Sequence, residues 1–276
     1  MQKEQKRKLK YSIVFCDIDD TLLDDRLQIS KLTASAIHQY ISCNGKFVLV
    51  TGRNYLSTKK IYNSLNLDTL LIVNQGIVYN PKTDQILYEK SFNTYDLIKL
   101  CKLLEQKNVY FQLFCDNIIY VKKKTFYSQQ YIQRCEVKIV ETGELLSSFI
   151  VRKKISFSKL MIECDEAFID PLFFEIVEQF EGVFSITKSK SWIIEISPLG
   201  LTKGNAIEYI LKEYGIRKDR AMAIGDSDND ISMFNKVGFS IAVKNSSPDI
   251  LISTNAITES NNNSGVGYAL EEYVYL

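Results

Sequence analysis

The fold is decided by the stretch Ile13-Val14-Phe15-Cys16-Asp17-Ile18-Asp19-Asp20-Thr21, in which an apolar run ends abruptly in acidic residues. Continuous apolar runs of this kind are typical of strands that are buried on both faces of a parallel sheet. In an open parallel sheet, ligands bind beyond the carboxyl ends of the strands. We therefore expect an α/β fold with its chemistry at the end of this strand.

Two further apolar runs, at residues 47–50 and 70–73, end before Thr51 and Asn74. Helical patterns at about 30–43 and 55–65 separate the three runs, and this order indicates a doubly wound, Rossmann-like parallel sheet. The same alternation of helices and apolar strands returns after Pro198. There we expect a helix at about 202–214, a strand at 221–224, a helix at about 230–237 and a strand at 240–243.

The middle of the chain follows a different pattern. Two β-rich runs flank Asp116-Asn117, which is hairpin chemistry, and residues 183–187 with 192–196 form a second hairpin pattern. A strand at 159–164 and a helix at 171–180 lie between them. We expect an inserted α+β cap domain over residues 83–195, with the core domain formed by residues 1–82 and 196–276.

The acids after the first strand have a counterpart in Gly225-Asp226-Ser227-Asp228-Asn229-Asp230, which follows another predicted buried strand. Carboxylates gathered at one sheet edge repel one another unless a cation lies among them. Oxygen donors without histidine or thiolate favour Mg²⁺. The alternative is that each cluster is a helix-capping loop, since Asp and Asn are favoured at N-caps.

Lys203 is placed in the first turn of a predicted helix, where the helix dipole disfavours a cation. If that helix begins at the same sheet edge, the lysine reaches the carboxylates and a bound anion. The alternative is an exposed surface lysine. Thr51, which ends the second strand and precedes Gly52 and Arg53, adds a hydroxyl at that edge.

The amino-acid composition excludes several classes of function. The 276 residues carry 34 Lys and Arg against 33 Asp and Glu, so we expect no nucleic-acid or membrane partner that binds through bulk charge. The single histidine, His38, makes a serine triad or a multi-histidine zinc site difficult to build. Six scattered cysteines and the lack of a signal-peptide pattern lead us to expect a cytoplasmic protein with reduced thiols.

These residues resemble the haloacid dehalogenase-like superfamily, and within it the Cof-like metabolite phosphatases, which carry a large inserted cap domain. The resemblance covers nearly the whole chain and lies in four motifs. They are Asp17-x-Asp19-x-Thr21, Thr51-Gly52-Arg53, Lys203-Gly204 and Gly225-Asp226-x-x-Asn229-Asp230. The chain departs from the family pattern at Asn74-Gln75-Gly76-Ile77, where relatives often have Asn-Gly-Ala, and at Asp20, where many relatives have glycine.

The resemblance implies a role for each motif residue. Asp17 would be the nucleophile, Asp19 the general acid and base, and Thr51 with Lys203 would hold the phosphoryl oxygens. The resemblance implies Mg²⁺ at Asp17, Asp226 and the backbone carbonyl of Asp19. Further contacts are implied for the substrate (Thr21, Gly52, Arg53 and Asn74) and for support of the metal site (Asn229 and Asp230).

Together, these features predict a Mg²⁺-dependent phosphatase that hydrolyses a small phosphorylated metabolite, such as a sugar phosphate or a phosphorylated cofactor, through an aspartyl-phosphate. A phosphomutase on the same scaffold and a non-hydrolytic phosphate-sensing module are the alternatives. Neither the physiological substrate nor the oligomeric state is indicated by any motif.

Overall fold

The computed structural model describes residues 7–115, 118–129 and 138–276. The chain divides into two compact units. The core unit comprises Met1–Gly52, Lys59–Tyr88 and Lys203–Leu276, and the inserted unit comprises Arg53–Thr58 and Glu89–Thr202. The predicted boundaries at residues 83 and 196 differ from these, because β5 (Gln85–Tyr88) pairs with the core sheet and β11 (Ile193–Pro198) completes the inserted sheet.

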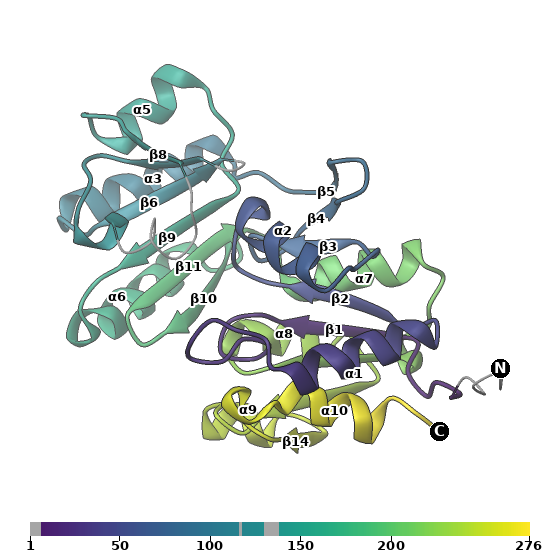
Figure 1. The fold of residues 1–276 in the computed structure, drawn as a ribbon. Helices are drawn as coiled ribbons and strands as arrows, with labels where there is room; N and C mark the ends of the chain where they lie inside the picture. Colours follow the sequence, from purple (N-terminus) through teal and green to yellow (C-terminus); the bar gives the residue numbers. More distant parts are fainter. Residues whose placement is uncertain (1–6, 116–117, 130–137) are drawn as a thin grey trace. The chain divides into compact units, whose positions relative to one another are not determined.

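The core unit is built on an eight-stranded sheet in the order β14-β13-β12-β1-β2-β3-β4-β5 (Figure 1). The first six strands in this order run parallel, and β4 and β5 are antiparallel additions. This confirms the predicted doubly wound core. The strand bounds are β1 (Ile13–Asp17), β2 (Lys46–Val50), β3 (Leu71–Val73), β4 (Ile77–Asn80), β12 (Ala221–Gly225), β13 (Phe239–Val243) and β14 (Ala256–Thr258).

Side chains that alternate along β1 pack on opposite faces of this sheet. Ile13 and Phe15 belong to one apolar cluster with Ile207 of α7 (Lys203–Glu213) and Met233 of α8 (Ile231–Phe234). The core unit also contains α1 (Lys31–Ser42), α9 (Pro248–Ile252), α10 (Gly265–Tyr273) and the part of α2 (Tyr55–Ser64) from Lys59 onward, and α1 packs against α10. The predicted helix at 230–237 is shorter, because a 3₁₀ turn at Asp228–Asp230 precedes α8.

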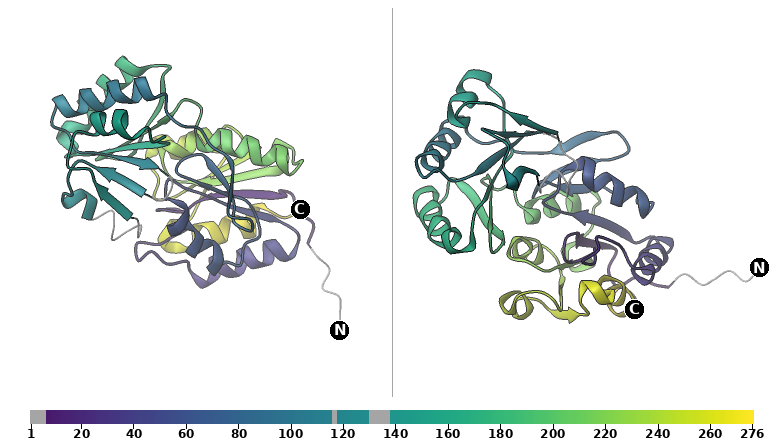
Figure 2. Two further views of the ribbon diagram at one scale, coloured as in Figure 1. Left: turned by 90° about the horizontal axis from the view of Figure 1, so that it is seen from above. Right: turned by 60° about the vertical axis from the view of Figure 1, so that its left-hand side comes forward.

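The inserted unit has its own six-stranded sheet in the order β10-β11-β9-β6-β7-β8, antiparallel except for the β7–β8 pair. Its helices α3, α5 and α6 lie against one face of this sheet (Figure 2). Residues of these helices and of the sheet form one apolar cluster. The strands are β6 (Phe111–Cys115), β7 (Ile118–Val121), β8 (Lys138–Glu141), β9 (Lys159–Glu163) and β10 (Phe184–Lys190). The helices are α3 (Thr94–Gln106), α5 (Leu146–Lys153) and α6 (Glu166–Phe180).

Both predicted hairpins form, as β6 with β7 and β10 with β11, although Asp116-Asn117 lie outside the described residues. The predicted helix start at Pro171 was wrong. Helix α6 begins five residues earlier at Glu166 and takes Pro171 into its interior. No helix among the described residues is both long enough and apolar enough to cross a membrane.

Candidate active site

Parallel pairing brings the ends of three strands to one edge of the core sheet. Asp17, the last residue of β1, pairs with Val50 of β2, so Thr51 follows at the same level. On the other side, Cys16 pairs with Ile224 of β12, and Asp226 comes just after that strand. The two acidic clusters and the Thr-Gly pair therefore meet at the carboxyl ends of adjacent strands.

Lys203 begins α7 and points its ammonium group into this cluster. Its Nζ atom donates hydrogen bonds to Asp17 Oδ1 at 2.6 Å, Asp230 Oδ1 at 2.7 Å and Asn229 Oδ1 at 3.1 Å. The residue is only 1% exposed, so the alternative of a surface lysine is wrong. Burial alone would lower the pKa of Lys203, but Asp17 and Asp230 outweigh this effect and raise it, so the ammonium stays charged.

Asp226 is linked directly to the first acidic cluster, because the Thr21 hydroxyl donates to Asp226 Oδ1 at 2.9 Å. Burial and the neighbouring charge of Asp230 raise the pKa of Asp226 to about 7. Burial likewise raises the pKa of Asp17, with Lys203 acting in the opposite direction. One ammonium group thus lies among three carboxyl groups, and the raised pKa values of Asp17 and Asp226 indicate that a further cation would stabilise the ionised forms of these two.

Asp230 organises the second cluster. Its Oδ1 accepts from Lys203, while its Oδ2 accepts from the backbone N–H groups of Asp226 at 3.0 Å and Ser227 at 3.2 Å. Together with Ser227 it forms a capping box on the 3₁₀ turn. A Cβ atom on Gly225 would lie 2.6 Å from Asp230 Cγ, so glycine is required for this close approach.

The cluster offers ligands for a divalent cation. Asp17, Asp226 and Asp230 each place a carboxylate oxygen within 4.8 Å of the others. Both oxygens of Asp230 already accept hydrogen bonds, which leaves Asp17 and Asp226 as the better donors. This all-oxygen donor set fits the hard cation Mg²⁺. The neighbouring Cys16 is a fully buried strand residue whose thiol pKa is raised well above its usual value by burial, so it does not offer a thiolate.

The residues of the second motif and the residue after the third strand differ in burial: Thr51 and Asn74 are buried, whereas Gly52 and Arg53 are half-buried. Thr51 is buried, and its backbone is fixed by Thr51 N–H donating to Ile72 and Gln75 N–H donating to Thr51. Gly52 is half-buried and ends the core segment, whereas the half-buried Arg53 belongs to the inserted unit. Asn74 is 1% exposed, and among the described residues its Oδ1 has no hydrogen-bond partner.

Both departures from the family pattern fall where the backbone is left-handed. Asp20 has a φ of 59°, Asn74 one of 45° and Gln75 one of 69°. Glycine adopts this conformation most readily, and Asn and Asp tolerate it better than most residues. Asp19, which precedes Asp20, is half-buried two residues after the end of β1. Sequence reasoning missed Asn245, whose side chain donates to the Asp20 carbonyl at 2.7 Å, because no local pattern relates the two segments.

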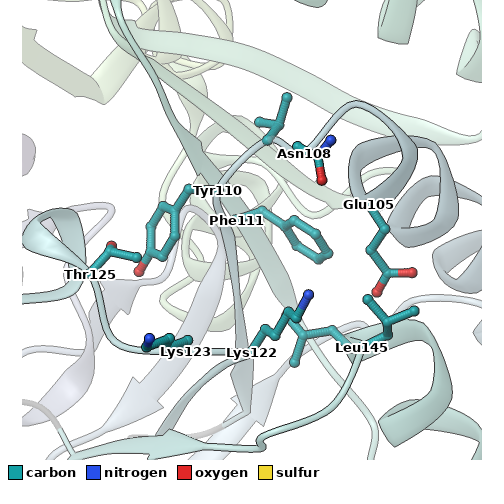
Figure 3. A pocket seen from close by; sticks show the side chains of 10 residues that line it. Glu105, Asn108, Tyr110, Phe111, Lys122, Lys123, Thr125 and Leu145 are labelled. Atoms are coloured by element: carbon teal, nitrogen blue, oxygen red, sulfur yellow. The ribbon is translucent and has the colours of Figure 1, made fainter.

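The inserted unit has a cavity of its own, of about 230 Å³ (Figure 3). Among its lining side chains are Glu105 and Lys122. Both carboxylate oxygens of Glu105 accept from Ser147, one from the backbone N–H at 2.9 Å and one from the hydroxyl at 2.6 Å. That carboxylate therefore helps to fix the start of α5. Within the described ranges, the three-acid cluster occurs only at the core sheet edge.

Comparison with known proteins identifies the family of this chain. A model of the haloacid dehalogenase-like hydrolase family matches residues 14–270. The putative phosphatase YxeH of Bacillus subtilis (strain 168) is 26% identical over 96% of this chain and 98% of its own length. The phosphatase YitU of the same organism, named for 5-amino-6-(5-phospho-D-ribitylamino)uracil, is 24% identical over 96% of this chain and 98% of its own length. The crystal structure of TM0651 from Thermotoga maritima superposes with a TM-score of 0.79 at 26% identity, covering 95% of this chain and 97% of that one.

The chain belongs to the haloacid dehalogenase-like hydrolases, since the family match extends over both ends of the core unit and the inserted unit between them. Within that family it is an enzyme of the Cof-like phosphatase type.

Proposed function

We propose that this phosphatase is Mg²⁺-dependent and hydrolyses a small phosphorylated metabolite, a sugar phosphate or a phosphorylated cofactor, through an aspartyl-phosphate on Asp17. The observation that carries the proposal is the contact of the buried Lys203 ammonium with Asp17 and Asp230. A fixed cation beside a carboxylate nucleophile can stabilise the charge that develops during phosphoryl transfer. The name of the relative YitU supports a phosphorylated metabolite as the class of substrate.

Asp17, Asp226 and the backbone carbonyl of Asp19 would hold Mg²⁺, with Asn229 and Asp230 supporting the site. When bound, the ion would act as a Lewis acid that stabilises the negative charge on the phosphoryl oxygens. Asp230 supports the site through the backbone N–H groups of Asp226 and Ser227, which fix the turn that carries Asp226. Thr21 orients the Asp226 carboxylate through its hydroxyl.

In the first half-reaction, a carboxylate oxygen of Asp17 attacks phosphorus and the bond from phosphorus to the leaving oxygen breaks. Asp19 donates its proton to that oxygen, which departs as an alcohol. Thr51, Lys203 and the substrate-binding residues Gly52, Arg53 and Asn74 would hold the phosphoryl group and the rest of the substrate. The Lys203 ammonium offsets the charge on the transferring oxygens because burial keeps water from screening it.

In the second half-reaction, a water molecule attacks the phosphorus of the aspartyl-phosphate. Asp19, now ionised, accepts a proton from this water, and the bond between phosphorus and the Asp17 oxygen breaks. Phosphate is released and Asp17 returns as a carboxylate. We also propose that the inserted α+β unit, residues 53–58 and 89–202, serves as the cap of the enzyme, with its residues selecting the leaving group.

Phosphate release from an aryl phosphate and from a panel of phosphorylated metabolites, with Mg²⁺ and with chelator, tests this proposal. We expect release that requires Mg²⁺ and that falls by at least about a thousandfold in Asp17→Asn. The matched control is Asp20→Asn, which changes an acid three residues away while keeping a side chain that tolerates the left-handed backbone. We expect phosphate release by Asp20→Asn to stay close to that of the native chain.

Three results would contradict the proposal. Unchanged hydrolysis by Asp17→Asn would remove the nucleophile assignment. If the folded native chain releases no phosphate from any compound but transfers a phosphoryl group between two positions of a sugar, it is a mutase. If it binds phosphate and Mg²⁺ without either reaction, it is a sensing module.

A further inference from the structure

Two asparagines from the C-terminal part of the chain bind the backbone, one within the Asp17–Thr21 motif and one just after it. Asn245, which follows β13, donates through Nδ2 to the Asp20 carbonyl at 2.7 Å. Asn261, in the 3₁₀ turn Asn261–Asn263, donates through Nδ2 to the Leu23 carbonyl at 3.1 Å. The two are joined, because the Asn261 backbone N–H donates to Asn245 Oδ1 at 3.0 Å. We call this connected pair the asparagine bridge.

The turn that carries Asn261 is itself firmly held. Asn261 is only 6% exposed, and Asn262 Oδ1 accepts from the backbone N–H of Asp25 at 3.1 Å. The Ser264 hydroxyl donates at 2.8 Å to Ser30, the residue that caps α1. The turn Asn261–Asn263 is therefore bound on several sides by hydrogen bonds. It anchors the C-terminal part of the chain to residues 20–30.

The bridge acts on the point of the motif where the backbone is least favourable. Asp20 has a φ of 59° and stands between Asp19 and Thr21. The φ and ψ angles of a left-handed residue turn the chain away from an extended path, so its conformation affects where the side chains on either side of it point. Asn245 fixes the carbonyl of Asp20, and Thr21 is fixed in turn by its bond to Asp226.

We propose that Asn245 and Asn261 are positioning residues that keep Asp19 aligned with the leaving oxygen. This inference rests on the proposed role of Asp19 as general acid. The bridge itself need not touch the substrate, because it acts through the backbone at Asp20 and Leu23. Correct placement of a catalytic group is worth a large factor in rate, and a displacement of about 1 Å can cost on the order of a hundredfold.

A misaligned general acid has a distinctive kinetic consequence. An alkyl phosphate has a basic leaving group that needs protonation as it departs, whereas a nitrophenyl phosphate has an acidic leaving group that departs without help. The value of kcat/KM reports only the steps up to the first phosphoryl transfer, so it isolates the proton donation by Asp19 from its later role as base. A loss of folded enzyme would lower both kcat/KM values equally.

The experiment compares kcat/KM for glycerol phosphate and for p-nitrophenyl phosphate in Asn245→Ala, Asn261→Ala and the native enzyme. We expect each variant to lose about tenfold or more on glycerol phosphate and less than about threefold on the nitrophenyl ester. Asp19→Asn, which removes the proposed general acid itself, should show the largest difference between the losses of kcat/KM on the two substrates. The control is Asn263→Ala, an exposed asparagine of the same turn, which keeps native values on both substrates.

Equal losses on the two substrates, or no loss on either, would overturn the inference. If Asn261→Ala fails to fold because Asn261 is buried, the exposed Asn245 carries the same test. If the native enzyme hydrolyses neither ester nor any metabolite, the proposed function fails and this inference falls with it. If the native enzyme hydrolyses both esters and the variants keep the native ratio, only the asparagine bridge is refuted.

Discussion

The Lys203 Nζ atom lies 2.6 Å from Asp17 Oδ1, although the two residues are 186 positions apart in the sequence. Their side chains are only 1% and 7% exposed, so neither charge is hydrated by bulk water. Asp230, fully buried, shares the same ammonium group at 2.7 Å. A single buried cation therefore joins the end of β1, the turn after β12 and the start of α7, and we expect the proposed site to depend on it for both charge balance and shape.

Replacing this cation tests both consequences. In Lys203→Met, Asp17 and Asp230 lose their shared partner, and removing one partner of a buried ion pair typically costs about 3–5 kcal/mol. We expect a loss of unfolding free energy of that size together with loss of phosphate release. Urea unfolding in chelator and steady-state hydrolysis measure the two effects.

A matched control comes from the surface pair Lys236–Glu208, whose side chains are 37% and 65% exposed. Exposed pairs contribute about 0–1 kcal/mol, so Lys236→Met leaves both stability and hydrolysis close to native. A stability loss in Lys203→Met no larger than that of Lys236→Met would show that the buried ammonium is not needed for charge balance.

The pKa of Asp226 predicts a pH dependence of the metal-free protein. A folded pKa of about 7, against an ordinary value of 3.8, means that the folded chain binds more protons than the unfolded chain between these values. Stability from this group is complete at low pH and is lost as the pH rises toward 7. We expect the metal-free protein to be more stable at pH 5 than at pH 7 by on the order of 2 kcal/mol.

Urea unfolding in chelator across this range, for the native chain and for Asp226→Asn, measures the effect. The amide cannot ionise, so the variant has a smaller pH slope and is more stable than the native chain at pH 7 without metal. Mg²⁺ should reverse that order, because only the native chain retains the ligand. An identical pH slope in the variant would show that Asp226 does not titrate as stated.

Much of the core could be predicted from sequence because its strands are short apolar runs that end in polar residues. Elements at the edges gave weaker signals. β14 is only three residues long with Ile257 half exposed, and α10 starts at Gly265, a residue that disfavours helix interiors. The prediction for α6 is wrong at its start because proline favours the first turn of a helix, whereas Pro171 lies inside this one.

Some features of the candidate site could likewise be predicted from the sequence, and others could not. Residue types and spacing after two buried strands predicted that Asp17 and Asp226 would lie at one edge, because parallel strands bring their carboxyl ends together. The full use of both Asp230 oxygens and the contact of Asn245 with Asp20 could not be predicted. Both depend on the course of loops between elements, for which hydrophobic periodicity carries no information.

Asn74 provides a prediction about substrate contact. Its buried Oδ1 has no hydrogen-bond partner in the described part of the chain, and a buried acceptor without a partner costs about 1–3 kcal/mol. A substrate hydroxyl would satisfy it. Asn74→Gly removes this oxygen and suits the φ of 45°. We expect unfolding free energy equal to or above native, with KM for the best metabolite raised about tenfold and kcat retained. A native KM in this variant would exclude Asn74 from substrate binding.

The inserted unit contains a second buried ion pair, and its energetics can be separated from those of the core site. Lys159 on β9 donates to Glu195 Oε1 on β11 at 2.6 Å, and the two side chains are 1% and 9% exposed. The ammonium also lies 5.1 Å from the ring centre of Phe114, which pairs with Lys159 across β6 and β9. Because removing one partner leaves a buried charge, Lys159→Met should lose about 3–5 kcal/mol.

Replacing both partners should have a different outcome. In the double variant Lys159→Met with Glu195→Leu, the ion pair is removed as a whole and the sheet face keeps side chains of similar volume, so stability should return to within about 1 kcal/mol of native or exceed it. Urea unfolding of the two single variants and the double variant forms a double-mutant cycle that measures this coupling. If the double variant is as unstable as the sum of the single ones, the pair is not coupled, and the sheet face of the inserted unit must depend on each charge through other contacts.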